Sequence, residues 1–270
     1  MARTAHGGAD MTAASQAASD QLYAAWQSGA VMAALPAACR PATRREGYAV
    51  QALLEPRSTA PLAGWKIAAT SSAGQAHIGV DGPLAGRLLA ERVLPSGSAL
   101  ALGHNRMRVA EVEFAFRMGC DLPPRAEIYS VDEVVAAVAT LHPAIEIPDS
   151  RYVDFVHAGG PQLIADNACA HWFVLGDATQ ADWRAHDLSR YPVRGEVSGL
   201  PDAQGSGANV LGDPRVALTW LANELSGLGI TLRAGQVVTT GTCVIPMAIA
   251  PGVTVRGDLG VFGTVTVAIT

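Results

Sequence analysis

Residues 108–116 read Arg108-Val-Ala-Glu-Val-Glu-Phe-Ala-Phe116, and this stretch decides the fold. Every second residue from 112 to 116 is apolar, and Glu111 and Glu113 stand at alternating positions. Side chains at alternating positions of a strand project from the same face. The stretch therefore predicts a strand with one apolar face that packs in a core and one face that carries two carboxylates side by side.

Short runs rich in Val, Ile and Leu, separated by Gly and Pro, recur along most of the chain beyond residue 60. This texture is typical of strands and tight turns. The expected strands are 64–69, 108–118, 143–148, 170–176, 190–199, 235–240, 252–257 and 261–269.

Helix signals are concentrated in the first 60 residues and at two later places. Capping-box sequences open the helices expected to start at Thr43 and at Ser130, the second running to about Leu141. Asp213 followed by a proline opens another helix, which ends near Ser226. We therefore predict an α+β protein with a disordered leader at 1–18, a helical N-terminal arm at 19–60 and a β-rich domain at 61–270.

The composition excludes several classes of protein. Charged residues make up 16% of the 270 residues and the formal net charge is −5. With 49% apolar residues the chain is too apolar and too weakly charged to be disordered. Its acidic balance argues against a nucleic-acid binder, which needs a basic face. No apolar run approaches the ~18 residues of a membrane span, and the N-terminus has no apolar core of a signal peptide. We expect a cytoplasmic protein with four free thiols.

A third acid repeats the pattern of the first two. Glu146 stands between two isoleucines in Pro143-Ala-Ile-Glu-Ile147, and these need a core on the opposite face of their strand. Neighbouring carboxylates repel one another unless a positive charge lies between them, and hard divalent cations prefer carboxylate oxygens. The alternative is that the three acids lie at the surface and pair with Arg108, Arg117 or Arg151.

Two other groups of polar residues stand in apolar surroundings. Lys66 is the single cation of Gly64-Trp-Lys-Ile67, and an ionised lysine is rarely buried without a partner. It either faces the acids or extends its ammonium into water. Asp166 and Asn167 precede an apolar run, so they belong either to a binding site or to a hydrogen-bonded buried turn.

Seven short motifs, taken in order, resemble the fumarylacetoacetate hydrolase superfamily, and most closely its 2-keto-4-pentenoate hydratase and 4-oxalocrotonate decarboxylase branch. The motifs are Gly64-Trp-Lys66, Ile78-Gly-Val-Asp81, Ala110-Glu-Val-Glu113, Pro143-Ala-Ile-Glu146, Ala165-Asp-Asn-Ala168, Leu211-Gly-Asp-Pro214 and Val238-Thr-Thr-Gly241. The resemblance runs from about residue 20 to the C-terminus.

The resemblance implies a mixed β-roll with a helical arm, in which 61–270 is the metal-binding catalytic domain. It implies Mg²⁺ or Mn²⁺ on three acids, which correspond to Glu111, Glu113 and Glu146. It also implies catalytic roles for Lys66 and Asp81. The substrate-binding residues that it implies are Asp166, Asn167, Cys169, Thr240 and Gly241.

The expected activity is the addition of water to a 2-hydroxy-2,4-dienoate, which gives a 4-hydroxy-2-oxo acid. Decarboxylation of 2-oxo-3-hexenedioate, at the same site, is the alternative. A second substrate carboxylate would need a cation at the far end of the pocket, and Arg87, Arg92 and Arg151 are candidates. An alternative of another class is a non-catalytic relative that binds an oxo acid or supports a partner enzyme.

One residue departs from the family pattern. In the hydratases that the chain resembles, Asp-Asn-Ala is followed by Ser, whereas this chain has Cys169, and a thiol is a poor hydrogen-bond donor. The low charge content leaves apolar surface to be buried between subunits, and the resemblance implies a homo-oligomer, a dimer or larger. It also implies pairing with a related decarboxylase or hydratase.

Overall fold

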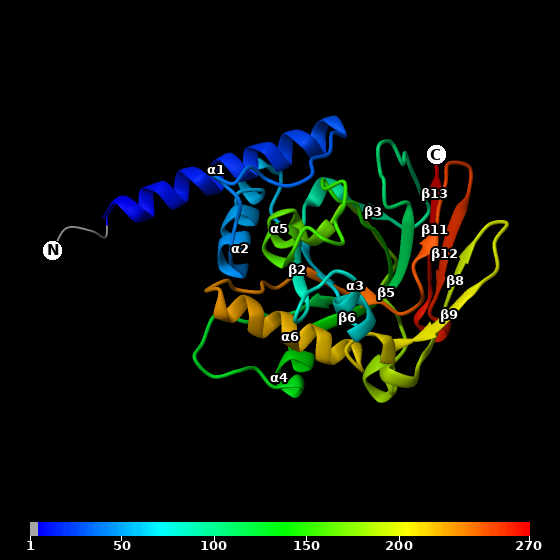
Figure 1. The fold of residues 1–270 in the computed structure, drawn as a ribbon. Coiled ribbons are helices and arrows are strands. Elements are labelled where there is room, and N and C mark those ends of the chain that lie inside the picture. Colours follow the sequence, from blue (N-terminus) through cyan, green and yellow to red (C-terminus); the bar gives the residue numbers. More distant parts are fainter. Residues whose placement is uncertain (1–4) are drawn as a thin grey trace.

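The computed structural model describes the backbone of residues 5–270 and the side chains of residues 12–270. Two curled β-sheets face each other, and helices cover one side of the larger sheet (Figure 1). The chain therefore has the mixed α/β architecture that the alternating patterns predict.

The larger sheet has eight strands. Its order is β2 (Leu84–Leu88), β1 (Gly64–Ala68), β10 (Val237–Thr242), β5 (Val109–Met118), β6 (Val138–Ile147), β7 (Trp172–Leu175) and β3 (Val93–Pro95), with β11 (Met247–Ala248) also pairing with β5. The smaller sheet has the order β4 (Ser98–Leu100), β13 (Thr264–Ile269), β12 (Thr254–Asp258), β8 (Pro192–Val197) and β9 (Ala203–Ser206). Each of the eight strands expected from the sequence overlaps a strand of the structure.

Six α-helices accompany the sheets in the described part of the chain. They are α1 (Ala5–Ser28), α2 (Arg44–Ala52), α3 (Ser72–His77), α4 (Val131–Ala136), α5 (Gly160–Ala165) and α6 (Pro214–Gly227). Both predicted capping boxes are present, on Thr43 and on Ser130, and Asp213 caps α6. The helix predicted to reach Leu141 ends at Ala136, because the apolar run that follows enters the core as strand β6.

The predicted disordered leader is largely helical. Helix α1 begins at Ala5, so residues 5–18 belong to it, and residues 1–4 lie outside the described residues. The alanine-rich composition of this segment favours a helix. Ala18, Leu22 and Trp26 are buried against the body of the protein, and this contact holds the helix beyond what its propensity supplies.

The main core lies between the two sheets. Val112, Phe114 and Phe116, the apolar face of β5, are fully buried there. Gly257 of β12 has no side chain at the point where an added Cβ would come within 2.8 Å of Val112, so the small sheet packs closely on β5. The opposite face of β5 therefore turns its carboxylates toward the inside of the curled larger sheet.

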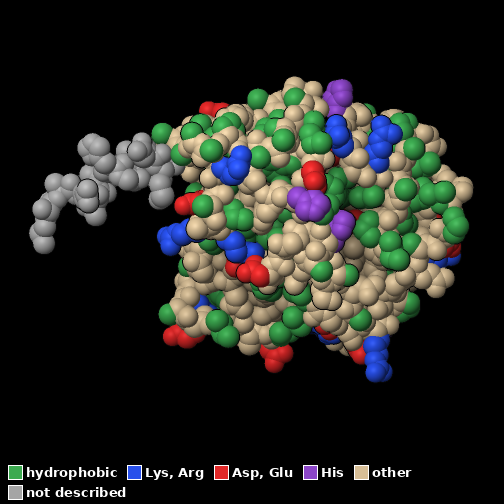
Figure 2. Space-filling model, viewed as in Figure 1, with side chains coloured by type: hydrophobic (Ala, Val, Ile, Leu, Met, Phe, Trp, Pro, Cys, Tyr) green, Lys and Arg blue, Asp and Glu red, His purple; other side chains and the backbone are tan. Residues whose placement is uncertain are grey.

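The surface carries few charges. Figure 2 shows lysine, arginine, aspartate and glutamate side chains scattered among hydrophobic and other side chains on the face it presents. The four cysteines are free, as predicted. Among the described residues, none of the helices combines the length and apolar character needed to cross a membrane.

Candidate metal centre and active-site cavity

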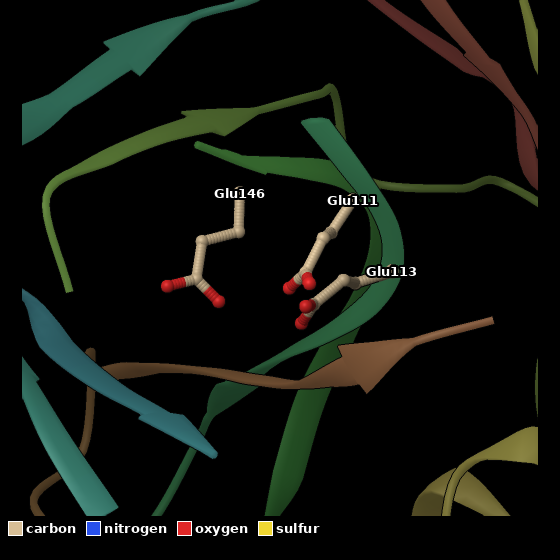
Figure 3. Close-up of side chains that lie close together, drawn as sticks. All are labelled: Glu111, Glu113 and Glu146. Carbon is tan, nitrogen blue, oxygen red and sulfur yellow. The ribbon is translucent and has the colours of Figure 1, made fainter. Parts of the chain in front are cut away.

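Strands β5 and β6 bring the three predicted acids together. The two strands are antiparallel, and their register sets Glu111 directly opposite Glu146. Glu113 follows Glu111 on the same face of β5, so all three side chains converge (Figure 3). One carboxylate oxygen from each lies within 4.8 Å of the other two. The predicted alternative, three surface acids paired with arginines, does not occur.

Glu113 is held from the neighbouring strand. Its Oε2 accepts a hydrogen bond from the Gly241 backbone N–H at 2.7 Å and a short one from the Thr239 hydroxyl. Its other oxygen, Oε1, accepts no hydrogen bond, although the side chain is fully buried. Strand β10 therefore fixes the direction of this carboxylate and leaves one oxygen facing the other acids.

Lys66 supplies the positive charge inside the larger sheet. Its Nζ lies 2.9 Å from Glu146 Oε1 and donates a hydrogen bond to the carbonyl oxygen of Ala168, also at 2.9 Å. Only 3% of the side chain is exposed, so Lys66 does not extend into water. The prediction that it faces the acids is confirmed.

The charges at the acids do not balance. Burial raises the pKa of Glu111 to about 7, with a further contribution from Glu146 that Lys66 opposes. Burial and the charge of Glu146 raise the pKa of Glu113 well above its usual value. Burial lowers the pKa of Lys66, but the charges of Glu146 and Glu111 outweigh it and raise that pKa. One ammonium therefore faces three carboxylates that resist ionisation in the absence of more positive charge.

This donor set fits a divalent cation. It offers three carboxylates, and two buried oxygens, Oε1 of Glu113 and Oε2 of Glu146, have neither a hydrogen bond nor an ion pair with any described residue. Buried polar atoms normally have partners, so orphaned acceptors that point at one another indicate a bound ion. Mg²⁺ and Mn²⁺ prefer such oxygens, and a charge of +2 beside Lys66 would neutralise all three carboxylates.

A cavity of about 940 Å³ opens next to the acids. Lys66, Glu111 and Gly241 line its inner part, together with Ala168 and Cys169. Glu113 and Glu146 lie behind this wall. The cavity is at the upper end of the range found for small-molecule sites. The geometry thus combines a cation site, a buried ammonium and room for an organic acid.

The sequence of residues 89–270 matches the family described as fumarylacetoacetate (FAA) hydrolase C-terminal. The chain belongs to the FAA hydrolase family. It is 33% identical over 238 residues to a 2-keto-4-pentenoate hydratase of Paraburkholderia xenovorans (strain LB400), covering 87% of each chain. It is 31% identical over 207 residues to a 4-oxalocrotonate decarboxylase of Pseudomonas sp, covering 77% of this chain and 78% of that protein.

A solved structure is also similar. The 4-oxalocrotonate decarboxylase from Pseudomonas putida G7, complexed with magnesium and adipate, superposes with a TM-score of 0.86 at 25% identity. The match covers 95% of this chain and 97% of that chain. This family member therefore shares its fold with a protein that holds magnesium and a dicarboxylic acid.

In this FAA hydrolase family member, Asp166 and Asn167 hold a turn together. Asp166 accepts hydrogen bonds from the Ser150 hydroxyl and from Arg151, with which it forms a buried ion pair. Asn167 exchanges two hydrogen bonds with the backbone of Arg87, at 2.7 and 2.9 Å. Neither residue lines the cavity, so the structure supports the predicted alternative of a hydrogen-bonded buried turn.

The turn that follows has unusual backbone geometry. Asn167, Ala168 and Cys169 have φ angles of 56°, 49° and 62°, in the left-handed region that few side chains favour. This conformation directs the Ala168 carbonyl to Lys66 and turns Cys169 to the cavity. Burial raises the pKa of the Cys169 thiol to about 12, so the cavity wall is neutral at this point.

The remaining predicted residues separate into two groups. Gly241 lines the cavity and binds Glu113, whereas the Thr240 hydroxyl donates to the Phe114 carbonyl on the other side of the strand. The Asp81 side chain is 94% exposed, lies 3.9 Å from Arg44, and is not among the described residues that line the cavity. The loop between α3 and β2 therefore does not bring Asp81 to the acids.

Two features of the site were not predicted from the sequence. Thr239, the residue before the predicted Thr240, is the hydroxyl that binds Glu113. Strand alternation could have identified it, since Thr239 and Gly241 share a face. His77, the last residue of α3, lines the cavity, and no sequence pattern had pointed to it.

The three arginines considered for a second substrate carboxylate lie elsewhere. Arg87 contacts Glu55 at 3.4 Å and also donates to a buried glutamine, while Arg151 is committed to its aspartate partner. The Arg92 guanidinium lies 4.5 Å from the centroid of the Trp172 ring and 5.0 Å from that of Trp26. None of the three lines the cavity as the structure describes it.

Proposed function

We propose that this chain is a divalent-metal-dependent hydratase that converts a 2-hydroxy-2,4-dienoate into a 4-hydroxy-2-oxo acid. The observation that carries the proposal is the cluster of Glu111, Glu113 and Glu146 beside the buried ammonium of Lys66, at the base of a cavity large enough for the acid. The similarity to 2-keto-4-pentenoate hydratases supports the same activity.

In this proposal Glu111, Glu113 and Glu146 hold Mg²⁺ or Mn²⁺. When bound, the ion would supply Lewis-acid chemistry toward the 2-oxo acid end of the substrate. Gly241 and Thr239 keep Glu113 in place through two hydrogen bonds, and Lys66 keeps Glu146 in place through an ion pair. The carboxylate end of the substrate therefore lies at the inner end of the cavity.

Lys66 has two tasks in the reaction. Its ammonium stabilises negative charge on the substrate's 2-oxygen when the enol loses its proton, and Nζ can give and take protons at the adjacent carbons. Ketonisation moves one proton from the enol oxygen to C5. Water then adds its hydroxyl to C4 and its second proton to C3, so the product contains the substrate's atoms plus one water.

The other residues predicted to bind substrate have two different roles in the proposal. Cys169 and Gly241 touch the substrate from the cavity wall, while Asp166, Asn167 and Thr240 act indirectly by holding the strands and the turn. The family resemblance implied a second proton-transfer role for Asp81, which the proposal does not adopt. Its exposed side chain lends that role no support.

Decarboxylation of 2-oxo-3-hexenedioate is the second candidate. The overall similarity to the 4-oxalocrotonate decarboxylase of Pseudomonas putida G7 favours it, since the match extends over nearly the whole of both chains. The lining of the cavity favours the hydratase. Among the described residues that line it, Lys66 is the only lysine or arginine, and it is already engaged with the acids.

The test uses the purified protein with Mg²⁺ and 2-hydroxypenta-2,4-dienoate. We expect loss of the dienol absorbance and formation of 4-hydroxy-2-oxopentanoate, and loss of both on adding EDTA or in Glu113→Ala. Release of CO₂ from 2-oxo-3-hexenedioate without hydration would make the chain a decarboxylase. If Glu113→Ala changes neither metal affinity nor any activity, the hypothesis of a non-catalytic relative is favoured.

The location, the oligomeric state and the partners of the enzyme are also part of the proposal. We expect a cytoplasmic homo-oligomer, a dimer or larger, that acts on small 2-oxo or 2-hydroxy acids and pairs with a related decarboxylase or hydratase. The low surface charge supports subunit contacts, as do strongly exposed apolar side chains such as Ile128 and Val261, which are 82% and 62% exposed. A monomer in light scattering at micromolar concentration would refute the oligomer.

A further inference from the structure

Most of the cavity lining away from the acids is apolar, with a few polar side chains such as Ser72, His77 and Asn209 among it. Val109 lies two residues before Glu111 on the same face of β5, so the wall that carries the acid continues as aliphatic surface. Met107, Ile78 and Phe155 line the cavity from three other segments of the chain. The cavity thus has a charged inner end and a long, mostly hydrophobic outer part.

No lysine or arginine of the described chain lines this outer part, where His77 packs edge-on against Phe155. Arg106 and Arg108 flank Met107 in sequence but do not line the cavity, and the Arg108 side chain donates to the Asn105 carbonyl. The buried arginines nearby are engaged in ion pairs or stacked on tryptophan rings. A carboxylate placed here would lose hydration and find no lysine or arginine in return, only His77 and neutral polar groups such as Ser72 and Asn209, whereas an apolar group loses nothing.

The size of the cavity points in the same direction. A five-carbon dienoate bound at the acids would occupy only a fraction of about 940 Å³ and would leave Met107 and Phe155 in contact with water. An apolar group attached to the substrate would displace that water, and burial of apolar surface is favourable.

We infer that the natural substrate carries an uncharged, apolar substituent on C5, so that the enzyme acts on 5-alkyl or 5-aryl 2-hydroxy-2,4-dienoates rather than on dicarboxylic acids. The inference rests on the proposed function for the reaction, but the preference for an apolar tail is a property of the cavity alone. Met107 and Phe155 are the residues that set it.

Turnover of three substrates tests the inference. They are 2-hydroxypenta-2,4-dienoate, 2-hydroxyocta-2,4-dienoate with its propyl tail, and 2-hydroxyhexa-2,4-dienedioate with a carboxylate tail, with absorbance loss and CO₂ both recorded. We expect kcat/KM to rise at least about tenfold from the first to the second and to fall for the third. A carboxylate tail that equals or exceeds the propyl tail overturns the inference, as does a propyl tail without any gain.

A binding measurement separates this inference from the proposed reaction. With Mg²⁺ present, 2-oxooctanoate and 2-oxoadipate offer the same 2-oxo acid head with an apolar and a charged tail. We expect calorimetry to give a Kd at least about tenfold lower for 2-oxooctanoate. If no dienoate is turned over but this preference is found, the proposed function fails and the inference stands. Equal affinities overturn the inference even if hydration occurs.

A charge introduced at Met107 tests the tail preference directly. Met107→Arg places a guanidinium in the outer cavity, while Met107→Gln has a similar length without the charge. We expect Met107→Arg to shift the ratio of affinities toward 2-oxoadipate by about tenfold or more relative to Met107→Gln. Circular dichroism checks that both variants fold. No difference between the two would remove Met107 from the tail site and overturn the inference.

Discussion

Replacement of Glu113 by Gln should have opposite effects on the metal-free and the metal-bound protein. Gln has the same shape, so its carbonyl oxygen can keep the hydrogen bonds from Thr239 and Gly241. Its amide group would take the place of the unpartnered Oε1 and face the carboxylates of Glu111 and Glu146, which accept hydrogen bonds. The change therefore removes one negative charge and little else.

The magnitudes follow from the geometry. Two unit charges at most 4.8 Å apart repel by about 3 kcal/mol or more at an effective dielectric constant near 20. Replacing Glu113 relieves these repulsions in the metal-free protein where the pH is high enough to ionise Glu113, whose pKa burial and the neighbouring acids raise. In wild type, Mg²⁺ at a hundred times its Kd should add about 2.7 kcal/mol of stability. With an unfolding entropy of about 2.1 cal/mol/K per residue over 270 residues, this raises Tm by about 5 °C.

The pH dependence has a definite sign. The folded-state pKa of Glu113 is raised, so the native protein holds a proton that the unfolded chain releases. The contribution of Glu113 to the stability of the metal-free wild type is therefore full below the unfolded pKa near 4.3 and is lost as pH rises toward its raised folded-state pKa. Glu113→Gln has no such loss, so its advantage in EDTA should grow between pH 6 and pH 8.5.

Thermal unfolding by circular dichroism, in EDTA and in MgCl₂ at three pH values, measures both effects. Glu196→Gln is the matched control, because Glu196 pairs with Arg194 and Arg256 on the small sheet, outside the described residues that line the cavity. The control should keep the full Mg²⁺ shift. A Glu113→Gln protein that keeps this shift, or that is less stable than wild type in EDTA at every pH, would refute the reasoning.

Four further predictions test other parts of the site. Lys66→Met should lower kcat/KM by at least about 100-fold while tightening Mg²⁺ binding in calorimetry, because it removes a positive charge 2.9 Å from Glu146; normal turnover would contradict it. Asp81→Asn should keep kcat/KM within about fivefold of wild type, as expected for an exposed ion pair, and a greater loss would restore its catalytic role. Gly241→Ala should destabilise the protein by at least about 2 kcal/mol in urea unfolding, since φ is 103° and an added Cβ would lie 2.0 Å from Thr70 Oγ1. Burial, with the charges of Arg151 and Arg92, lowers the pKa of His171 to about 3, so its neutral form stabilises the fold above pH 6.5. This stability, at most about 5 kcal/mol, is lost as pH falls toward 3, and His171→Gln should flatten that acid loss in pH-dependent unfolding.

The three acids of the metal site could be predicted from the sequence, because side chains of a strand alternate strictly between its two faces. Glu111 and Glu113 had to share a face once residues 108–116 formed a strand, and the isoleucines around Glu146 forced it to the opposite side from the core. The convergence of the two strands, by contrast, depends on a pairing register that local patterns do not encode.

Other parts of the site lay beyond local patterns. A buried Asp such as Asp166 is equally consistent with a substrate contact and with an ion pair, and only its distant partner Arg151 distinguishes the two. The helix predicted to reach Leu141 was too long because a run of Val, Ala, Thr and Leu suits either a buried helix or a buried strand. Asp81 matched a motif, but a motif does not state which way a loop faces.

In the left-handed turn at residues 167–169, the strained backbone and the side chain that faces the cavity are held by different contacts. The strain belongs to the backbone, and the bonds from Asn167 to the Arg87 backbone and from Lys66 to the Ala168 carbonyl hold it in place. The side chain of Cys169 contributes to neither bond. Replacement of Cys169 by serine therefore leaves both bonds in place, so a single atom can change the hydrogen-bonding character of the cavity wall without disturbing the bonds that hold the turn.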